Sequence, residues 1–132
     1  MIKQLAHVCL ETADLQRCIA FYQDGLGFPV KFTFVRQGKP VGVYFSLGAR
    51  SFLEVFERNP PAKTVHFSLE TDNLDAFATE LEAKGIECTR KQMGACGTWA
   101  IWVRDPDGNA FEVQEYTNHS HQFNGGECEV DW

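Results

Sequence analysis

An internal repeat constrains the fold of this chain more than any other feature of its sequence. Residues 7–15 (HVCLETADL) align with residues 66–74 (HFSLETDNL) at an offset of 66 − 7 = 59, and five of the nine positions are identical. Residues 53–57 (LEVFE) align with residues 111–115 (FEVQE) at an offset of 111 − 53 = 58. Two matching segments at nearly the same offset indicate a tandem duplication of one structural unit.

Each half of the duplication has the same predicted order of elements. The pattern predicts a strand, then an amphipathic helix ending near Gly25 or Gly27 in the first half and at Gly85 in the second. It then predicts three strands per half, at about 28–36, 40–47 and 50–57 and at about 86–91, 98–104 and 109–115. Residues 105–108 (DPDG) predict a turn between the last two strands.

This order predicts the α+β class, with two tandem βαβββ modules whose curved mixed sheets enclose a metal site. We expect one domain over residues 1–132, with module one at about 4–57 and module two at about 64–116. The polar, acidic residues 117–132 lie outside the repeat. We expect them to fray or to pack Phe123 and Trp132 against a partner chain.

Strand alternation places the polar residues of the repeat on one face of each sheet. Neighbouring side chains of a strand point to opposite faces, so His7 is expected to share a face with Leu5 and Cys9. Glu57 and Glu115 have the opposite parity and are expected to be structural, as are Glu11 and Glu70 beside the helix starts. The polar residues that face the concave side at pseudo-symmetric positions are His7, Glu54, His66 and Glu112.

These four residues predict a site for a divalent metal. A buried carboxylate is costly unless it is paired or metal-bound, and two facing carboxylates repel each other. A divalent cation with two neutral imidazoles and two carboxylates carries no net charge, which removes both penalties. Mixed nitrogen and oxygen ligation suits Ni, Zn, Co, Mn or Fe. Two coordination positions would remain for water or for two adjacent oxygens of a substrate.

The charge and composition of the chain exclude several classes of partner. A net charge of −6 argues against nucleic acid and against an anionic membrane surface. The sequence has no apolar run of about 18 residues that could span a membrane. Its start does not resemble a signal peptide, so we expect a cytoplasmic protein. Five scattered cysteines without a C-x-x-C pair predict reduced thiols rather than disulfides.

The motifs of the chain resemble those of the vicinal oxygen chelate superfamily over about residues 4–116. This superfamily includes glyoxalase I, methylmalonyl-CoA epimerase, extradiol dioxygenases and the fosfomycin- and bleomycin-resistance proteins. The resemblance rests on His7 with Asp14 and Leu15, on residues 21–28 (FYQDGLGF) and 52–55 (FLEV), on His66, and on residues 105–112 (DPDGNAFE). It implies the same four metal ligands. An acid at position 54 is typical of glyoxalase I-like members.

The resemblance implies a lactoylglutathione lyase-like enzyme, a carbon–sulfur lyase or isomerase. It would transfer a proton beside a carbonyl through a metal-bound enediolate, with Glu112 or Glu54 as the base. Its substrate would be a small molecule with two vicinal oxygens, and members of this length usually form homodimers. The alternatives are another metal enzyme of the superfamily, such as an extradiol dioxygenase or an epimerase, and a non-catalytic small-molecule-binding module of the same fold.

The charges near the expected pocket entrance argue against a glutathione adduct as substrate. Glyoxalase I has an arginine for the glutathione carboxylate four residues after the first ligand, where this chain has Glu11. Arg58 is the best-placed residue to bind a substrate carboxylate instead, with Arg36 and Lys91 as further candidates. Six strand aromatics are expected either to pack in the core or to line an apolar pocket: Phe32, Phe34, Tyr44, Phe45, Trp99 and Trp102.

Overall fold

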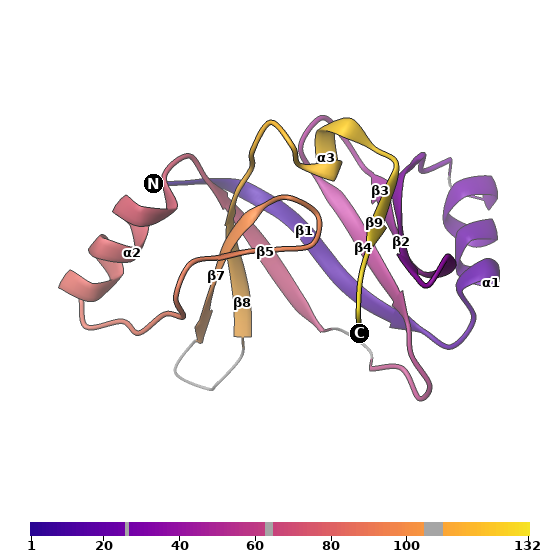
Figure 1. Ribbon diagram of the computed structural model, residues 1–132, viewed down its shortest axis with the longest axis horizontal. Helices are drawn as coiled ribbons and strands as arrows, with labels where there is room; N and C mark the ends of the chain where they lie inside the picture. The colour runs from indigo at the N-terminus through magenta and orange to yellow at the C-terminus, as the bar shows by residue number, and fades with distance from the viewer. Residues whose placement is uncertain (26, 63–64, 105–109) are drawn as a thin grey trace.

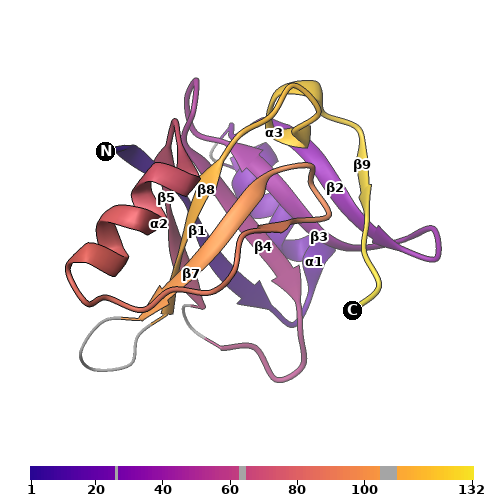
Figure 2. The same cartoon turned by 60° about the vertical axis from the view of Figure 1, so that its left-hand side comes forward.

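The chain folds into one curved, unclosed sheet with a helix near each end (Figures 1 and 2). A computed structural model describes residues 1–25, 27–62, 65–104 and 110–132. In these ranges the elements are β1 (Ile2–Thr12), α1 (Leu15–Ile19), η1 (Ala20–Gly25), β2 (Val30–Arg36), β3 (Lys39–Ser46), β4 (Phe52–Glu57), β5 (His66–Thr71), α2 (Leu74–Ala83), β6 (Gln92–Met93), β7 (Trp99–Arg104), β8 (Ala110–Glu115), α3 (His121–Asn124) and β9 (Glu127–Glu129).

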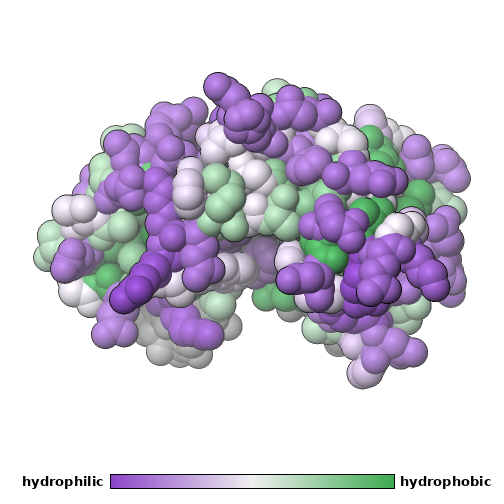
Figure 3. Space-filling model, in the orientation of Figure 1, coloured by the Kyte–Doolittle hydropathy of each residue, from purple (hydrophilic) through white to green (hydrophobic). Residues whose placement is uncertain are grey.

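The strand order confirms the predicted α+β class and its tandem βαβββ units. The nine strands of the described residues run in the order β6-β7-β8-β5-β1-β4-β3-β2-β9. The first and last strands of each unit are parallel neighbours, β1 with β4 and β5 with β8. The antiparallel pair of β1 with β5 joins the two units at the centre of the sheet. Figure 3 shows a notch between the two resulting lobes.

The structure departs from the predicted elements in two places. The strand expected at about 86–91 is absent from the described residues there. Instead, Cys88 makes an isolated bridge to Val103, and β6 is only two residues long. The first helix continues beyond α1 as the π-helical segment η1. The turn predicted at residues 105–108 lies outside the described residues.

Capping residues and strand-end glutamates fix the start of both longer helices. The side chain of Asp14 accepts a hydrogen bond from Arg17 N, and Asn73 accepts one from Ala76 N. The Glu57 carboxylate accepts a hydrogen bond from Leu15 N at 3.0 Å, and Glu115 accepts one from Leu74 N at 2.7 Å. These contacts give Glu57 and Glu115 the structural role expected from their strand parity.

Apolar packing separates the outer face of the sheet from its concave face. On the outer face, α1 covers a cluster that includes Val43, Phe45, Leu53 and Val55. The residues between them in β3 and β4 point the other way, because side chains alternate along a strand. On the outer face of the second unit, α2 packs on Ile101, Val103 and Val113. The concave face of the first unit is lined by Cys9, Phe32, Phe34, Tyr44, Phe52 and Phe56.

Residues 117–132 return to the first unit of their own chain instead of fraying. Strand β9 pairs in parallel with β2, so that Phe34 aligns with Cys128. Cys128 and Val130 are buried in the concave cluster. Trp132 packs on Phe56, with ring centroids 6.2 Å apart. This segment therefore covers the concave face of the first unit of its own chain.

Candidate metal centre

Four neighbouring strands carry the four residues predicted as metal ligands. His7 and His66 lie on the central strands β1 and β5, Glu54 on β4 and Glu112 on β8. A β-bulge in β1 shifts the register, so that Leu5 pairs with Leu69 and His7 with Ser68. His7 thus faces the concave side together with Cys9. Leu5 shares the outer face with Leu69, so its predicted place beside His7 was wrong.

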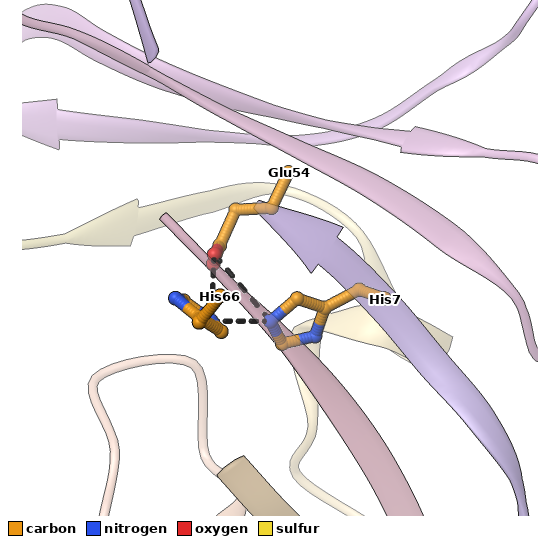
Figure 4. A group of neighbouring side chains, drawn as sticks. All are labelled: His7, Glu54 and His66. Atoms are coloured by element: carbon orange, nitrogen blue, oxygen red, sulfur yellow. Dashed lines mark hydrogen bonds and ion pairs between the residues drawn. The ribbon is translucent and has the colours of Figure 1, made fainter. Parts of the chain in front are cut away.

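The side chains of His7, Glu54 and His66 point toward one another in the concave space between the two units (Figure 4). His7 Nε2 lies 2.9 Å from His66 Nε2 and 3.5 Å from Glu54 Oε2. His66 Nε2 lies 3.7 Å from Glu54 Oε2. The ligand atoms of these three residues all lie within 4.8 Å of one another. Glu112 joins the group through its Oε2 atom, 3.5 Å from His7 Nε2.

The spacing and the donor types fit a bound divalent cation. Metal–ligand bonds to histidine and carboxylate are about 2.1 Å long, so neighbouring ligand atoms on one ion are about 3.0 to 3.5 Å apart. The observed separations of 2.9 to 3.7 Å are close to this range. The buried Oε2 of Glu112 has no hydrogen-bond partner among the described residues. A lone buried carboxylate oxygen of this kind is costly, and a cation would satisfy it.

Burial keeps the four groups close to neutral in the protein alone. It raises the pKa of Glu54 to about 8, and the nearby Glu112 carboxylate adds to this rise. It also raises the pKa of Glu112 to about 7. Burial and the second imidazole lower the pKa of His7 to about 3, and burial lowers that of His66 to about 4. Neutral imidazoles are the form that binds metals.

Two further residues, Tyr44 and Ser68, lie beside the candidate ligands but were not predicted from the sequence. The Tyr44 hydroxyl lies 2.7 Å from His7 Nδ1, and the Ser68 hydroxyl is fully buried beside Glu112. The sequence placed Tyr44 among six strand aromatics that could either pack in the core or line a pocket, and it did not distinguish Tyr44 from the other five. The repeat offset of 59 could have identified Ser68, because Ser68 corresponds to Cys9, which was predicted to lie on the same strand face as His7.

The other predicted binding residues lie apart from the four ligands or have other partners. Arg58 stacks over Phe56, and its Nε atom is 4.0 Å from Glu11 Oε1. Lys91 pairs with Asp75 at 2.8 Å. Glu70, which was expected to be structural rather than to bind a ligand, is buried and paired with Arg50, and this pair ties the β3–β4 turn to β5. Of the six aromatics, Phe45 and Trp99 pack towards the helices, whereas Phe32, Phe34 and Tyr44 pack inside the concave face and Trp102 contacts His66.

Comparison with known sequences establishes the family of the chain. It belongs to the Glyoxalase/Bleomycin resistance protein/Dioxygenase superfamily, whose sequence profile matches residues 4–113. The virulence protein STM3117 of Salmonella typhimurium is 27% identical over 126 residues, covering 88% of this chain and 86% of that protein. The metallothiol transferase FosB of Shouchella clausii is 25% identical over 124 residues, covering 89% of this chain and 83% of that protein.

Solved structures show the same fold at lower sequence identity. Methylmalonyl-CoA epimerase from Mycobacterium tuberculosis superposes with a TM-score of 0.74 at 18% identity, over 88% of this chain and 89% of the epimerase. The Streptomyces coelicolor epimerase in complex with 2-nitronate-propionyl-CoA gives 0.72 at 19% identity, over 91% of this chain and 99% of the epimerase. No helix within the described residues is long and apolar enough to cross a membrane.

Proposed function

We propose that this chain is a metal-dependent lyase or isomerase of the glyoxalase type, which moves a proton on a carbon beside a carbonyl group. One observation carries the proposal: the ligand atoms of His7, Glu54 and His66 lie within 4.8 Å of one another, and the buried Glu112 Oε2, which has no hydrogen-bond partner among the described residues, lies 3.5 Å from His7 Nε2. His7, Glu54, His66 and Glu112 would hold a divalent ion of Ni, Zn, Co, Mn or Fe. That ion would stabilise negative charge on two neighbouring substrate oxygens.

Glu112 is the better candidate for the general base. Its pKa near 7 is suited to taking and returning a proton at neutral pH. Its side chain is 16% exposed, against 11% for Glu54, so it is the more accessible of the two carboxylates. Glu54 Oε2, by contrast, lies within 4 Å of both imidazoles. We assign Glu54 mainly to holding the ion and Glu112 to moving the proton.

The charges around the site support a compact substrate without a glutathione tail. Arg58 lies close to Glu11, so a substrate carboxylate would have to displace that neighbour to bind it. The net charge of −6 also opposes an anionic substrate. We therefore expect weak turnover of the methylglyoxal–glutathione adduct relative to a small, neutral α-hydroxycarbonyl. If Arg58 does bind such a tail, efficient turnover of the adduct should collapse in Arg58→Ala.

Epimerisation is the second candidate, because the same geometry supports it. Epimerisation requires the proton to be removed from one face of the carbon and returned to the opposite face, and the second carboxylate, Glu54, could supply that proton opposite Glu112. The fold likeness to methylmalonyl-CoA epimerases is compatible with this outcome. The two reactions share their first step, removal of a proton from carbon.

One experiment tests both reactions. The purified protein would be analysed for bound metal and incubated in D₂O with a panel of small α-hydroxycarbonyls, methylmalonyl-CoA and the methylglyoxal–glutathione adduct. NMR would then report deuterium incorporation at the carbon beside the carbonyl. We expect about one metal ion per chain and incorporation with at least one small substrate. A metal-loaded protein that exchanges no proton in any of them would favour a thiol transferase or a binding module.

We also propose a homodimer formed through the outer face of the central strands. Leu5 and Phe67 are 46% and 40% exposed there, on the side of β1 and β5 that faces away from the metal ligands. The two helices lie at opposite ends of the sheet and leave this middle region open (Figure 1). Covering large exposed apolar side chains with a second copy would be favourable.

A further inference from the structure

The duplication extends to one aromatic residue beside each histidine. Tyr44 pairs with Glu54 across β3 and β4, and Trp102 pairs with Glu112 across β7 and β8. The two aromatics are separated by 102 − 44 = 58 residues, the offset of the glutamates themselves. The Tyr44 ring lies 5.5 Å from the His7 ring, and the Trp102 ring lies 4.8 Å from the His66 ring.

The two aromatics hold their histidines in different ways. The Tyr44 hydroxyl is 2.7 Å from His7 Nδ1, which is a short hydrogen bond. Tyr44 is 1% exposed, and its ring is fixed by stacking on Phe32 at 4.6 Å and by contact with Phe52. Trp102 is 37% exposed and touches His66 only with its ring among the described contacts.

A histidine that binds a cation through Nε2 must carry its proton on Nδ1, and that N–H needs an acceptor. The other ring nitrogen of a metal-bound histidine almost always has such a partner, which fixes both the tautomer and the ring orientation. The Tyr44 oxygen lies at the required position on His7.

We infer that Tyr44 is a positioning residue, which holds the His7 ring with Nε2 directed at the shared ligand space and with the proton on Nδ1. The inference rests on the proposed metal site and goes beyond it by ranking the two histidines. His7 becomes the pre-oriented ligand that anchors the ion. His66, which lacks an equivalent hydrogen bond to Trp102, becomes the ligand with more freedom to adjust.

Tyr44→Phe tests this inference, because it removes one oxygen atom and keeps the ring. Zn²⁺ affinity would be measured by competition with a chromophoric chelator in the full chain. We expect the Kd to rise by about 10- to 100-fold while binding stays at one ion per chain. Tyr22→Phe makes the same change at a ring packed on Phe28 and Phe45, towards α1, and should bind Zn²⁺ like the unmodified protein.

A spectroscopic measurement separates a positioning role from a general loss of stability. Long-range ¹H–¹⁵N NMR of the Zn²⁺-loaded protein should show His7 protonated on Nδ1, and Tyr44→Phe should shift that signal while leaving His66 in place. Unchanged Zn²⁺ affinity and an unchanged His7 signal in Tyr44→Phe would overturn the inference. If the unmodified protein binds none of Zn²⁺, Co²⁺, Ni²⁺, Mn²⁺ and Fe²⁺, the proposed function itself fails, and this inference fails with it.

Discussion

The two halves of the candidate metal centre have the same residue types but different surroundings. In the first half, the His7 side chain is 4% exposed, hydrogen-bonded to Tyr44, and lies in the unit that residues 117–132 cover. In the second half, the His66 side chain is 11% exposed, and two buried oxygens, on Ser68 and Glu112, have no hydrogen-bond partner among the described residues. The duplicated halves therefore carry equivalent candidate ligands in different environments, the first more enclosed and the second more exposed.

The largest effect should follow from removing a histidine, and it tests whether the two halves contribute equally. His7→Ala and His66→Ala should each reduce metal binding beyond the ~10- to 100-fold typical of losing an outer partner, because each removes a direct ligand. His7→Ala should be the more severe of the two, since its ring is the better ordered. Metal content after dialysis against a fixed free-metal buffer measures both variants.

Glu57→Gln is the control for the histidine variants. Its side chain can still accept the hydrogen bond from Leu15 N, and it points away from the metal ligands. It should retain full metal content. Full occupancy in His66→Ala would remove the basis for a site shared between the two units.

The next effect separates the two carboxylates. Glu112→Gln should lower the rate of deuterium exchange by about 10²- to 10⁴-fold at saturating metal, as expected for loss of a general base. Glu54→Gln should mainly weaken metal binding, so that added metal restores part of the rate. Exchange rates measured across a metal titration distinguish the two. If added metal rescues Glu112→Gln instead, the roles of the glutamates are reversed.

A smaller effect concerns pH, because the pKa values of the two carboxyls are raised to about 8 and about 7. A cation requires both groups deprotonated, so the apparent metal affinity should increase as the pH rises from about 6 to 9, with release of protons. Isothermal titration calorimetry in buffers of different ionisation enthalpy would count those protons. A metal affinity that does not change with pH over this range would contradict the raised pKa values of the two buried carboxyls.

The metal-free protein should show the opposite trend in stability. Its carboxyls keep their protons to about pH 7 to 8, whereas in the unfolded chain they lose them near the ordinary value of 4.5. The stability that they contribute is therefore present below about pH 4.5 and is lost as the pH rises through 7 to 8. The two buried neutral histidines have the opposite effect below about pH 6.5, so the melting temperature in chelator should fall from about pH 6.5 to 8, and that of the metal-loaded protein should fall less.

The smallest effect on the metal centre should come from the outer face. Phe67→Glu places a charge where Phe67 stacks on Phe111 at 5.0 Å, and it should convert the proposed dimer to a monomer without altering metal content. Phe21→Glu changes a phenylalanine that is 59% exposed beside α1 and serves as the control. Light scattering at micromolar concentration measures both. A 14.9 kDa monomer in the unmodified protein would exclude the dimer.

Sequence alone predicted the fold class and brought the four polar residues to one face, because both depend on short-range periodicity and on the repeat. It missed features that depend on long-range partners. The strand expected at about 86–91 reduces to a bridge because Thr89 bonds the backbone of Trp102 through both its N–H and its hydroxyl. The bulge in β1 that turns Leu5 to the outer face also cannot be predicted from the order of polar and apolar residues in that strand.

The bond between Tyr44 and His7 was equally hidden from local patterns. A tyrosine with this parity is as suitable for a packed core as for a site, and only the pairing of β3 with β4, and of β4 with β1, brings the two side chains together. Applying the 58-residue offset to every strand would have singled out Tyr44 and Trp102 as a matched pair.

The pairing of β9 with β2 has a consequence for the order of folding. It joins residues 127 − 33 = 94 positions apart, between the last strand and one of the earliest. Closing so long a loop costs entropy before any contact repays it, and contacts of this range form slowly. The helices and hairpins of both units need no such closure. We therefore expect the concave face of the first unit, although encoded first, to be covered last.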